Sequence, residues 1–250
     1  MNPDYLATLD ALRRAFGPAS ETPLLVDIMA KHFGRPGTIS MLDVGIGNGV
    51  SARKVAEGLS RNGIHVELTG IDPYLPPSAY QLNWPRKPHL AASGLASFDP
   101  GSTYDVVNAT QCLYYLGDES AALRKLASLV SPGGILTITV WDDGCTLKKI
   151  HDAYLAPGRP SPSGMGVSRA LAGVPSLTGP SQVYRFAGTI RLAGNDGTIL
   201  DAILDIAGRG AGSTGEARLR AKAYLRSLGT TAPRRNAIVT AGRAAEGAGI

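Results

Sequence analysis

The chain has 250 residues, of which 44% are hydrophobic and 18% charged, and its net charge is +5. This length and composition suit one large globular domain or a domain with a cap. It has no run of about 20 apolar residues, which excludes a membrane-spanning helix, and no signal-peptide pattern at its first residues. Cys112 and Cys145 are its two cysteines, which excludes a disulfide framework or a CxxC metal site and favours a cytoplasmic protein without a metal.

Two amphipathic helices are expected before the first strand. Residues 4–16 and 24–33 place apolar side chains at helical spacing, and Gly17 and Pro18 separate them. Residues 34–38 then form a turn. We expect residues 1–37 to form a helical cap on a single domain that spans residues 1–250.

A glycine-rich turn follows an apolar run at residues 39–42 and precedes a helix-like segment at residues 51–59. The turn consists of Gly45, Ile46, Gly47, Asn48 and Gly49. Glycine allows unusual backbone angles and close approach of a ligand, and the free N–H groups of the next helix favour a carboxylate or phosphate. The GxGxG spacing is one residue too short for the GxGxxG dinucleotide fingerprint. Asp43 adds a carboxylate at the strand end, where an ammonium group can donate to it.

A second strand is expected at residues 65–71, where apolar and polar residues alternate. Asp72 follows it, 23 residues after Gly49, about where the second parallel strand of a βαβ unit should end. A carboxylate at this strand end can accept two hydrogen bonds from a ribose diol. Since several nucleotide cofactors carry that ribose, Asp72 alone does not distinguish among them.

Two further segments continue the alternation of strands and helices. Residues 104–116 form a strand and the loop after it, and a helix-like run covers residues 119–130. The turn Ser131-Pro132-Gly133-Gly134 then precedes an apolar strand at residues 135–141.

Together, the features between residues 39 and 143 resemble the class I S-adenosylmethionine-dependent methyltransferases of the small-molecule type. The resemblance implies an α/β fold: a Rossmann-like three-layer sandwich with a seven-stranded, mostly parallel sheet whose last strand is antiparallel. Residues 38–143 would form the cofactor-binding core. Residues 144–250 would supply a substrate-side loop and complete the sheet.

The same resemblance implies S-adenosyl-L-methionine as the cofactor and S-adenosyl-L-homocysteine as its product. The glycines would approach the methionine part, Asp43 would orient the loop or the ammonium group, and Asp72 would bind the ribose. The candidate cofactor-binding residues are Asp43, Gly45, Ile46, Gly47, Asn48, Gly49, Asp72, Pro73, Tyr74, Asn108 and Ala109. One feature departs from the family, because neither Ser93 nor Gly94 supplies the acid that commonly contacts adenine after the third strand.

Candidates for substrate contact and catalysis follow the fourth and fifth strands. Gln111, Tyr115 and Trp141 are candidate substrate-binding residues, and no general base is identified. The candidates for a catalytic role are His151, Tyr114 and Asp142. Asp142 would recognise a cationic acceptor or cap the next helix, and His151 would lie on the substrate side or on a helix surface. Asn108 lacks the two prolines of the (D/N)PPY motif, which disfavours methylation of a nucleobase amino group.

The second half of the chain contains a long Pro- and Gly-rich stretch at residues 156–180, which we expect to be a mobile loop and a lid. Residues 183–192 are expected to form a strand, and residues 194–197 a turn. Residues 198–206 suit a strand or a short helix equally. Residues 236–241 are expected to form the final, antiparallel strand.

Basic residues gather near the C-terminus. On a helix expected at residues 214–228, Arg218, Lys222 and Arg226 recur every four residues. Such a stripe is either a solvated helix flank or a contact surface for an anionic substrate or RNA. Aromatic side chains for base stacking are scarce there, which disfavours nucleic acid without excluding it.

Three functions therefore stand as hypotheses. The first is methyl transfer to a small-molecule acceptor, in specialised metabolism. The second is an RNA methyltransferase that uses the basic stripe, and the third is a non-catalytic Rossmann-like binding protein. A dehydrogenase that binds NAD is disfavoured by Asp43 and by the glycine spacing. The sequence gives no indication of the oligomeric state.

Overall fold

The computed structural model describes residues 15–16, 21–192, 197–208 and 213–245. Most of the helix expected at residues 4–16, and with it much of the expected cap, lies outside these residues, as do residues 194–196 of the expected turn. The strands are β1 (Gly37–Val44), β2 (Ile64–Ile71), β3 (His89–Ala91), β4 (Tyr104–Thr110), β5 (Val130–Trp141), β6 (Thr178–Arg191) and β7 (Thr231–Gly242). The α-helices are α2 (Glu21–Phe33), α3 (Val50–Arg61), α4 (Pro77–Tyr80), α5 (Glu119–Ser128), α6 (Thr146–Ile150), α7 (Gly164–Ala172), α8 (Gly197–Ala207) and α9 (Gly215–Ser227). Short turns of other helix types are η1 (Leu95–Ser97), η2 (Leu113–Tyr115) and the π-helical η3 (His151–Leu155).

The strands form one seven-stranded sheet in the order β3-β2-β1-β4-β5-β7-β6. β1 pairs in parallel with β2 and β4, and β4 pairs in parallel with β5. β7 runs antiparallel to both of its neighbours. The predicted fold class, a mostly parallel Rossmann-like sheet whose last strand is antiparallel, is confirmed.

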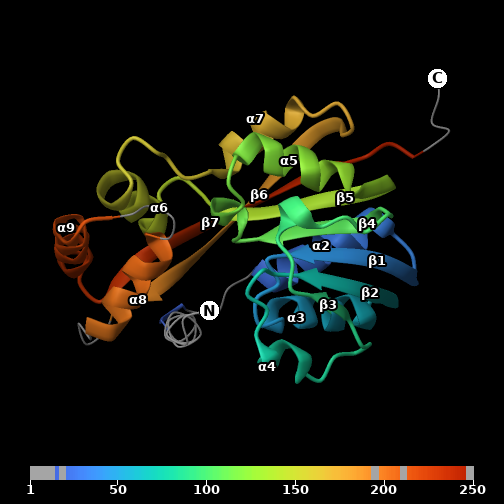
Figure 1. Cartoon of the computed structure of the whole chain (residues 1–250), viewed down its shortest axis with the longest axis horizontal. Helices are drawn as coiled ribbons and strands as arrows, with labels where there is room; N and C mark the ends of the chain where they lie inside the picture. The colour runs from blue at the N-terminus through green and yellow to red at the C-terminus, as the bar shows by residue number, and fades with distance from the viewer. Residues whose placement is uncertain (1–14, 17–20, 193–196, 209–212, 246–250) are drawn as a thin grey trace. The chain divides into compact units, whose positions relative to one another are not determined.

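The chain divides into two compact units. The larger contains Glu21–Val140, Gly164–Tyr184 and Ile238–Ile250, and the smaller contains Met1–Ser20, Trp141–Ser163 and Arg185–Ala237. In the larger unit, α5 and α7 lie above the strands in Figure 1, and α3 and α4 lie below them. Its core is built from the inner faces of β1, β4 and β5 and from the apolar sides of α5 and α7.

Local sequence explains the elements that frame the site. The alternating residues of β2 are alternately buried and exposed along its first half. In α3, Ala52, Val55, Ala56 and Leu59 recur at helical spacing and are buried. Gly49 begins this helix with φ 78°, a conformation that glycine adopts without steric cost.

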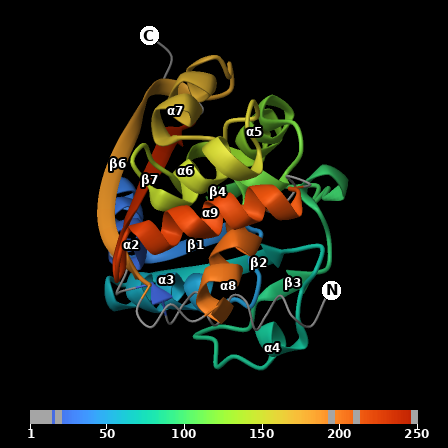
Figure 2. The same cartoon turned by 90° about the vertical axis from the view of Figure 1, so that its left-hand side faces the viewer.

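The smaller unit is mainly helical. Its helices α8 and α9 cross in the foreground of Figure 2, and α6 contacts α8, while α9 contacts η3. Phe16 forms an isolated antiparallel bridge with Ile190, and the guanidinium of Arg234 lies 4.4 Å from the centre of the Phe16 ring.

Two sequence expectations were wrong in detail. The stretch at residues 156–180 is not one long loop, because it contains α7 and the start of β6; Val167 and Leu171 of α7 are buried in the core. The expected turn at residues 131–134 belongs to β5, where the Gly133 amide donates to the Arg243 carbonyl oxygen at 2.9 Å.

The segment at residues 198–206, which suited two structures, is helix α8. Its buried residues Leu200, Ile203, Leu204 and Ala207 follow the i, i+3, i+4, i+7 pattern of one helix face. Packing on one side therefore decides a segment that local periodicity left open.

Candidate active site

The sheet order identifies one edge of the larger unit as the place for a ligand. β1 and β4 are neighbours in the sheet. After β1 the chain continues to β2 on one side of this pair, and after β4 it continues to β5 on the other side. Ligands of open α/β sheets bind outside the strand ends at such a switch point. The glycine turn at residues 45–49 follows β1, and Gln111 follows β4.

The three glycines of the turn all have positive φ, at 70° for Gly45, 56° for Gly47 and 78° for Gly49, but they differ in surroundings. A side chain at Gly45 would meet the Cβ of Cys112 at 2.6 Å, and one at Gly49 would meet the ring of Trp84 at 2.7 Å. At Gly47, the corresponding position has no atom within 4 Å from any described residue beyond its two chain neighbours. Gly47 therefore leaves open space for a ligand, whereas the other two glycines accommodate protein side chains. Sequence reasoning missed the contact of Trp84 with the turn.

Asp72 joins the glycine turn to the end of β2. Its Oδ2 accepts a hydrogen bond from the Gly47 amide at 3.1 Å, and its Oδ1 accepts one from the Tyr74 amide at 2.8 Å. Each carboxylate oxygen has further acceptor capacity. Asp72 therefore fixes the backbone at Gly47 and keeps lone pairs for a ligand.

A buried polar chain connects three neighbouring strands at this edge. The Asn108 Nδ2 donates to the Asp43 Oδ1 at 2.5 Å, and the Thr137 Oγ1 donates to the Asn108 Oδ1 at 2.7 Å. The strand register places Asn108 beside both partners, and all three residues are buried. Because Thr137 holds the oxygen of the Asn108 amide, the amide nitrogen is directed at Asp43.

Burial changes the acidity of Asp43. Loss of solvent raises the pKa of its carboxyl from 3.8 to about 7; the Asn108 hydrogen bond opposes the rise, and the charge of Asp72 adds to it. An ammonium group at this site would favour the ionised carboxylate. The Asp43 carboxyl can therefore lose its proton and bind as a carboxylate when a cationic group of a ligand contacts it.

The remaining cofactor candidates have varied surroundings. Ile46 is buried and packs against Gly70, and Ala109 belongs to the core, so their side chains serve packing. The Asn48 Oδ1 accepts from the Val50 amide at 3.3 Å, at the start of α3. Pro73 is exposed, as is Tyr74, with 62% of its surface accessible. No acid stands at the end of β3, where the Ser93 amide bonds to the Ala91 carbonyl oxygen.

The structure brings three substrate and catalytic candidates together after β4. The Tyr114 hydroxyl donates to the Gln111 Oε1 at 3.3 Å, and the rings of Tyr114 and Tyr115 meet edge to face with centroids 6.0 Å apart. Tyr115 is 40% exposed, whereas Tyr114 is partly buried against the core.

The other candidates belong to the smaller unit. Asp142 is buried, and its Oδ2 accepts from the Nε of Arg185 at 2.8 Å, so the chain itself supplies a cation to this carboxylate. The N-cap residue of α6 is Cys145, which makes no side-chain capping hydrogen bond, so the structure does not show Asp142 as that cap. The rings of Trp141 and His151 lie 6.2 Å apart.

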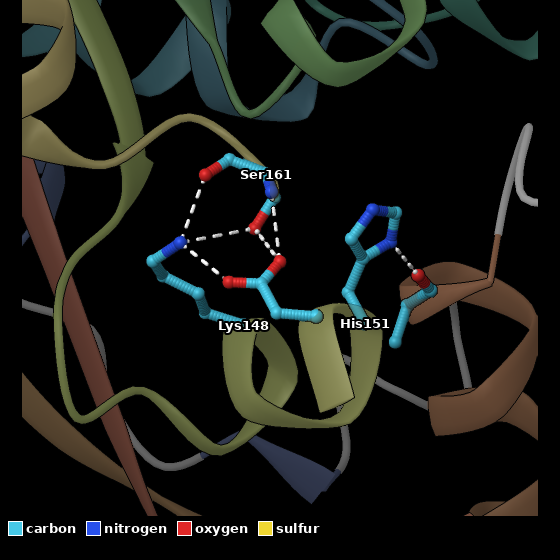
Figure 3. A network of polar contacts seen from close by, with 5 residues as sticks. Lys148, His151 and Ser161 are labelled. Carbon is cyan, nitrogen blue, oxygen red and sulfur yellow. Dashed lines mark hydrogen bonds and ion pairs between the residues drawn. The ribbon is translucent and has the colours of Figure 1, made fainter. Parts of the chain in front are cut away.

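His151 begins the π-helical turn η3, and its Nδ1 lies 2.6 Å from the Ala207 carbonyl oxygen (Figure 3). A carbonyl oxygen only accepts, so Nδ1 carries the proton and Nε2 has the lone pair of the neutral ring. Beside it, the Lys148 Nζ contacts Asp152 at 2.6 Å and the Ser161 carbonyl oxygen at 2.8 Å, and Ser161 donates its hydroxyl to Asp152 (Figure 3).

The basic stripe of α9 is largely engaged within the smaller unit. Arg218 lies 2.6 Å from Asp205 of α8, and Lys222 lies 2.9 Å from Asp201 of the same helix. Two of the three cations therefore form ion pairs between α8 and α9. This arrangement provides a structural role for the stripe.

Membrane-spanning helices and metal clusters are both absent from the described parts of the chain. None of their helices is long and apolar enough to cross a membrane. They also contain no group of three or more histidine, cysteine or acidic side chains placed to hold a metal ion. Both cysteines are buried thiols, and burial raises the pKa of each.

Comparison with known proteins gives matches in sequence and in fold. The profile of a family described as "methyltransferase domain" matches residues 4–166. The ubiquinone biosynthesis O-methyltransferase of Sodalis glossinidius is 30% identical over 154 residues, which cover 54% of this chain and 57% of that protein. That of Aeromonas salmonicida is 31% identical over 125 residues, which cover 46% of each. The chain thus matches about half the length of these curated relatives.

Two solved structures share the fold. The YcgJ protein of Bacillus subtilis aligns with a TM-score of 0.62 and 14% identity, over 88% of this chain and 98% of that one. The N-methyltransferase NodS of Bradyrhizobium japonicum WM9, in complex with S-adenosyl-L-homocysteine, aligns with a TM-score of 0.53 and 16% identity, over 90% and 86% of the two chains. At these identities the likeness concerns the fold.

Proposed function

Because the chain belongs to the methyltransferase-domain family, we propose that it transfers a methyl group from S-adenosyl-L-methionine to a small-molecule acceptor. The observation that carries this proposal is the edge of β1 and β4, where the open Gly47 donates its amide to Asp72 and the buried Asp43 lies near the end of β1. The sulfonium of the cofactor supplies an electrophilic methyl group. The protein then has to bind, align and desolvate the two partners.

The residues at this edge fit the cofactor in their chemistry. The buried Asp43 suits the ammonium of the methionine part, and Asp72, held at the glycine turn, retains lone pairs for the ribose hydroxyls. The carboxylate of the methionine part suits the N-terminal end of α3, because the first amides of a helix have no carbonyl partner within the helix. Asn108 supports this set by orienting Asp43.

The acceptor is proposed to be a hydroxyl of a small organic molecule, including those of specialised metabolism. The relatives named as O-methyltransferases support an oxygen acceptor. In such a transfer the hydroxyl oxygen supplies the pair for the new O–C bond, the S–C pair stays on sulfur, and the hydroxyl proton leaves to solvent. A catalytic role for His151, which belongs to the smaller unit, stays a prediction from the sequence.

An RNA acceptor and a non-catalytic binding function are the two alternatives. An RNA acceptor would require Arg218 and Lys222, which are already paired with acids of α8. A non-catalytic binding protein would keep the cofactor site but transfer nothing. We also propose a cytoplasmic location, which the two buried free thiols support.

The test is transfer of a labelled methyl group from S-adenosyl-L-methionine to separate panels of phenols, amines and RNA. The proposal expects label in at least one small molecule, with RNA unlabelled. Label in RNA alone would replace the small-molecule acceptor by the second hypothesis. Binding of S-adenosyl-L-homocysteine without transfer to any panel would favour the binding protein.

A further inference from the structure

Gln111 occupies a fixed place at the ligand edge of the larger unit. It follows the last residue of β4, next to the switch point between β1 and β4. Its backbone N–H donates to the carbonyl oxygen of Thr139 in β5 at 2.9 Å, which extends the pairing of β4 with β5 by one residue. The backbone that carries its side chain is therefore anchored on the sheet and does not belong to a loose loop.

The backbone of Gln111 is strained. Within the described ranges, it is the one residue other than glycine with a positive φ, at 55°. Side chains with a Cβ disfavour this left-handed region, and glutamine lacks the short polar group that lets asparagine and aspartate adopt it. Such strain persists where the surrounding structure imposes it, and it concentrates at binding and catalytic sites.

The side chain of Gln111 is held at one end only. Tyr114 donates its hydroxyl to the Oε1 at 3.3 Å, which orients the amide. The Nε2 at the other end is buried and has no hydrogen-bond partner among the residues that the structure describes. Buried polar groups are nearly always paired, so an oriented donor without a partner indicates that something outside the chain completes the site.

From these two features we propose that Gln111 is a specificity residue, whose Nε2 donates a hydrogen bond to an oxygen of the methyl acceptor. This inference rests on the proposed function and deepens it. The oxygen that Gln111 recognises is a second one, beside the hydroxyl that receives the methyl group. The acceptor class is then a small compound with two neighbouring oxygen functions, such as a catechol or a hydroxybenzoate.

The tyrosines next to Gln111 favour an aromatic acceptor. Tyr115 is 40% exposed, and its ring meets that of Tyr114 edge to face. Aromatic rings prefer such edge-to-face and offset arrangements, so an acceptor ring can add to this pair. The donor of Gln111 and the exposed ring of Tyr115 thus recognise different parts of one molecule.

The test compares Gln111→Leu, which removes the hydrogen bonds but keeps the bulk, with Gln111→Gly, which relieves the positive φ. Gln81→Leu is the matched control, because Gln81 is an exposed glutamine at the end of α4. The probes are catechol and 3,4-dihydroxybenzoate, with benzylamine as an acceptor without oxygen. Three quantities are measured for each variant: kcat/KM with each probe, the Kd for S-adenosyl-L-homocysteine, and the Tm of the ligand-free protein.

We expect Gln111→Leu to lower kcat/KM for a dioxygenated probe by about 10- to 100-fold and to leave the Kd unchanged. The Tm of both Gln111 variants should equal or exceed that of the wild type, because each removes an unpaired donor or backbone strain. A residue that merely bonds a structural water would instead lower the Tm of Gln111→Leu. The control should change none of the three quantities.

Several results would overturn the inference while the proposed function stands. These are unchanged turnover of a dioxygenated probe by Gln111→Leu, a lower Tm in both Gln111 variants, or wild-type transfer to benzylamine but to neither dioxygenated probe. Binding of S-adenosyl-L-homocysteine without transfer to either dioxygenated probe overturns the acceptor class. Absence of both binding and transfer overturns the proposed function, and the inference with it.

Discussion

Asp43 makes the stability of the ligand-free protein depend on pH. Its pKa is raised from 3.8 to about 7 by burial, so the native state holds its proton longer than the unfolded state does. Stability is therefore full below the unfolded pKa and falls as the pH rises from about 4 to about 7, by up to about 4 kcal/mol. Urea unfolding across this range measures the loss. Asp43→Asn should show a flatter profile, and an equally steep decline in that variant would contradict the assignment.

The same carboxyl should make cofactor affinity rise with pH. An ammonium group binds the ionised form, so affinity for S-adenosyl-L-homocysteine should increase between about pH 6 and pH 8. Titration calorimetry in buffers of different ionisation enthalpy would show proton release on binding near pH 6. An affinity that does not change with pH would mean that Asp43 does not meet the ammonium.

Thr137 is expected to act through Asn108. Thr137→Val removes the hydrogen bond that holds the Asn108 Oδ1, which should destabilise the fold by about 1–2 kcal/mol and weaken cofactor binding several-fold, because Asp43 loses its oriented partner. Thr139→Val is the matched control, since Thr139 is equally buried in β5 and its hydroxyl lies 3.5 Å from that of Thr110, whereas the Thr137 hydroxyl bonds Asn108. Equal loss of affinity in the two variants would show that orientation of Asn108 is not the cause.

The ion pairs between α8 and α9 are expected to support structure rather than RNA binding. Arg218→Glu and Lys222→Glu place like charges opposite Asp205 and Asp201, and because these pairs are partly exposed, each should cost about 0.5–1 kcal/mol. Arg226→Glu, one turn further along α9, is the control. Thermal melts and RNA binding at several salt concentrations measure the outcome. Salt-sensitive RNA binding that all three substitutions abolish would restore the RNA hypothesis.

The segment at residues 156–163 is expected to depend on Ser161 for its order. Ser161 joins Asp152 through both its amide and its hydroxyl, and its carbonyl oxygen accepts from Lys148. Ser161→Ala keeps the backbone contacts and removes the hydroxyl, so cleavage in residues 156–163 during limited proteolysis should become faster. Ser163→Ala is a nearby comparison. Unchanged cleavage in Ser161→Ala would show that the hydroxyl does not hold the segment.

This segment also revises the idea of a lid over residues 156–180. Shortening that whole stretch would remove α7, whose Val167 and Leu171 belong to the core. Loss of turnover in such a deletion would then reflect unfolding. Only residues 156–163 remain a candidate for a lid, and whether they act as one stays a prediction.

Much of the sheet could be predicted from the sequence because its signals are local. Apolar strands, the glycine turn and the helices after it lie close together in the chain, and β1, α3, β2, β4 and α5 all formed near the expected residues. The second half was harder. α7 contains two glycines, and its helical state is supported by the burial of Val167 and Leu171, a tertiary effect that outweighs local propensity.

The positions of the candidate site residues in the fold could be predicted from the sequence, but the side chains that contact them could not. The sequence located Asp43, Gly47, Asp72 and Asn108 near the carboxyl ends of their strands: Asp43 and Asn108 lie within the last residues of β1 and β4, and Gly47 and Asp72 follow β1 and β2. It could not indicate that Thr137 orients Asn108, that Arg185 neutralises Asp142, or that Trp84 packs on Gly49. Those contacts depend on register and on segments distant in sequence, which no local pattern encodes.

We propose that the glycine turn of the larger unit binds the methyl donor. Isothermal titration of the wild type, Gly47→Ala and Gly101→Ala with S-adenosyl-L-homocysteine, and with NAD as the control ligand, tests it directly. Both glycines have positive φ, and in the described part of the chain no residue beyond their chain neighbours comes within 4 Å of the place that a Cβ would take, so alanine strains each by a similar amount, roughly 1 kcal/mol. Only Gly47 lies at the proposed site, whereas Gly101 precedes β4.

We predict that S-adenosyl-L-homocysteine binds the wild type and Gly101→Ala with equal affinity, that Gly47→Ala weakens binding at least about tenfold, and that NAD does not bind. Equal affinity in all three proteins, or binding of NAD alone, would show that the glycine turn is not the binding site of the methyl donor.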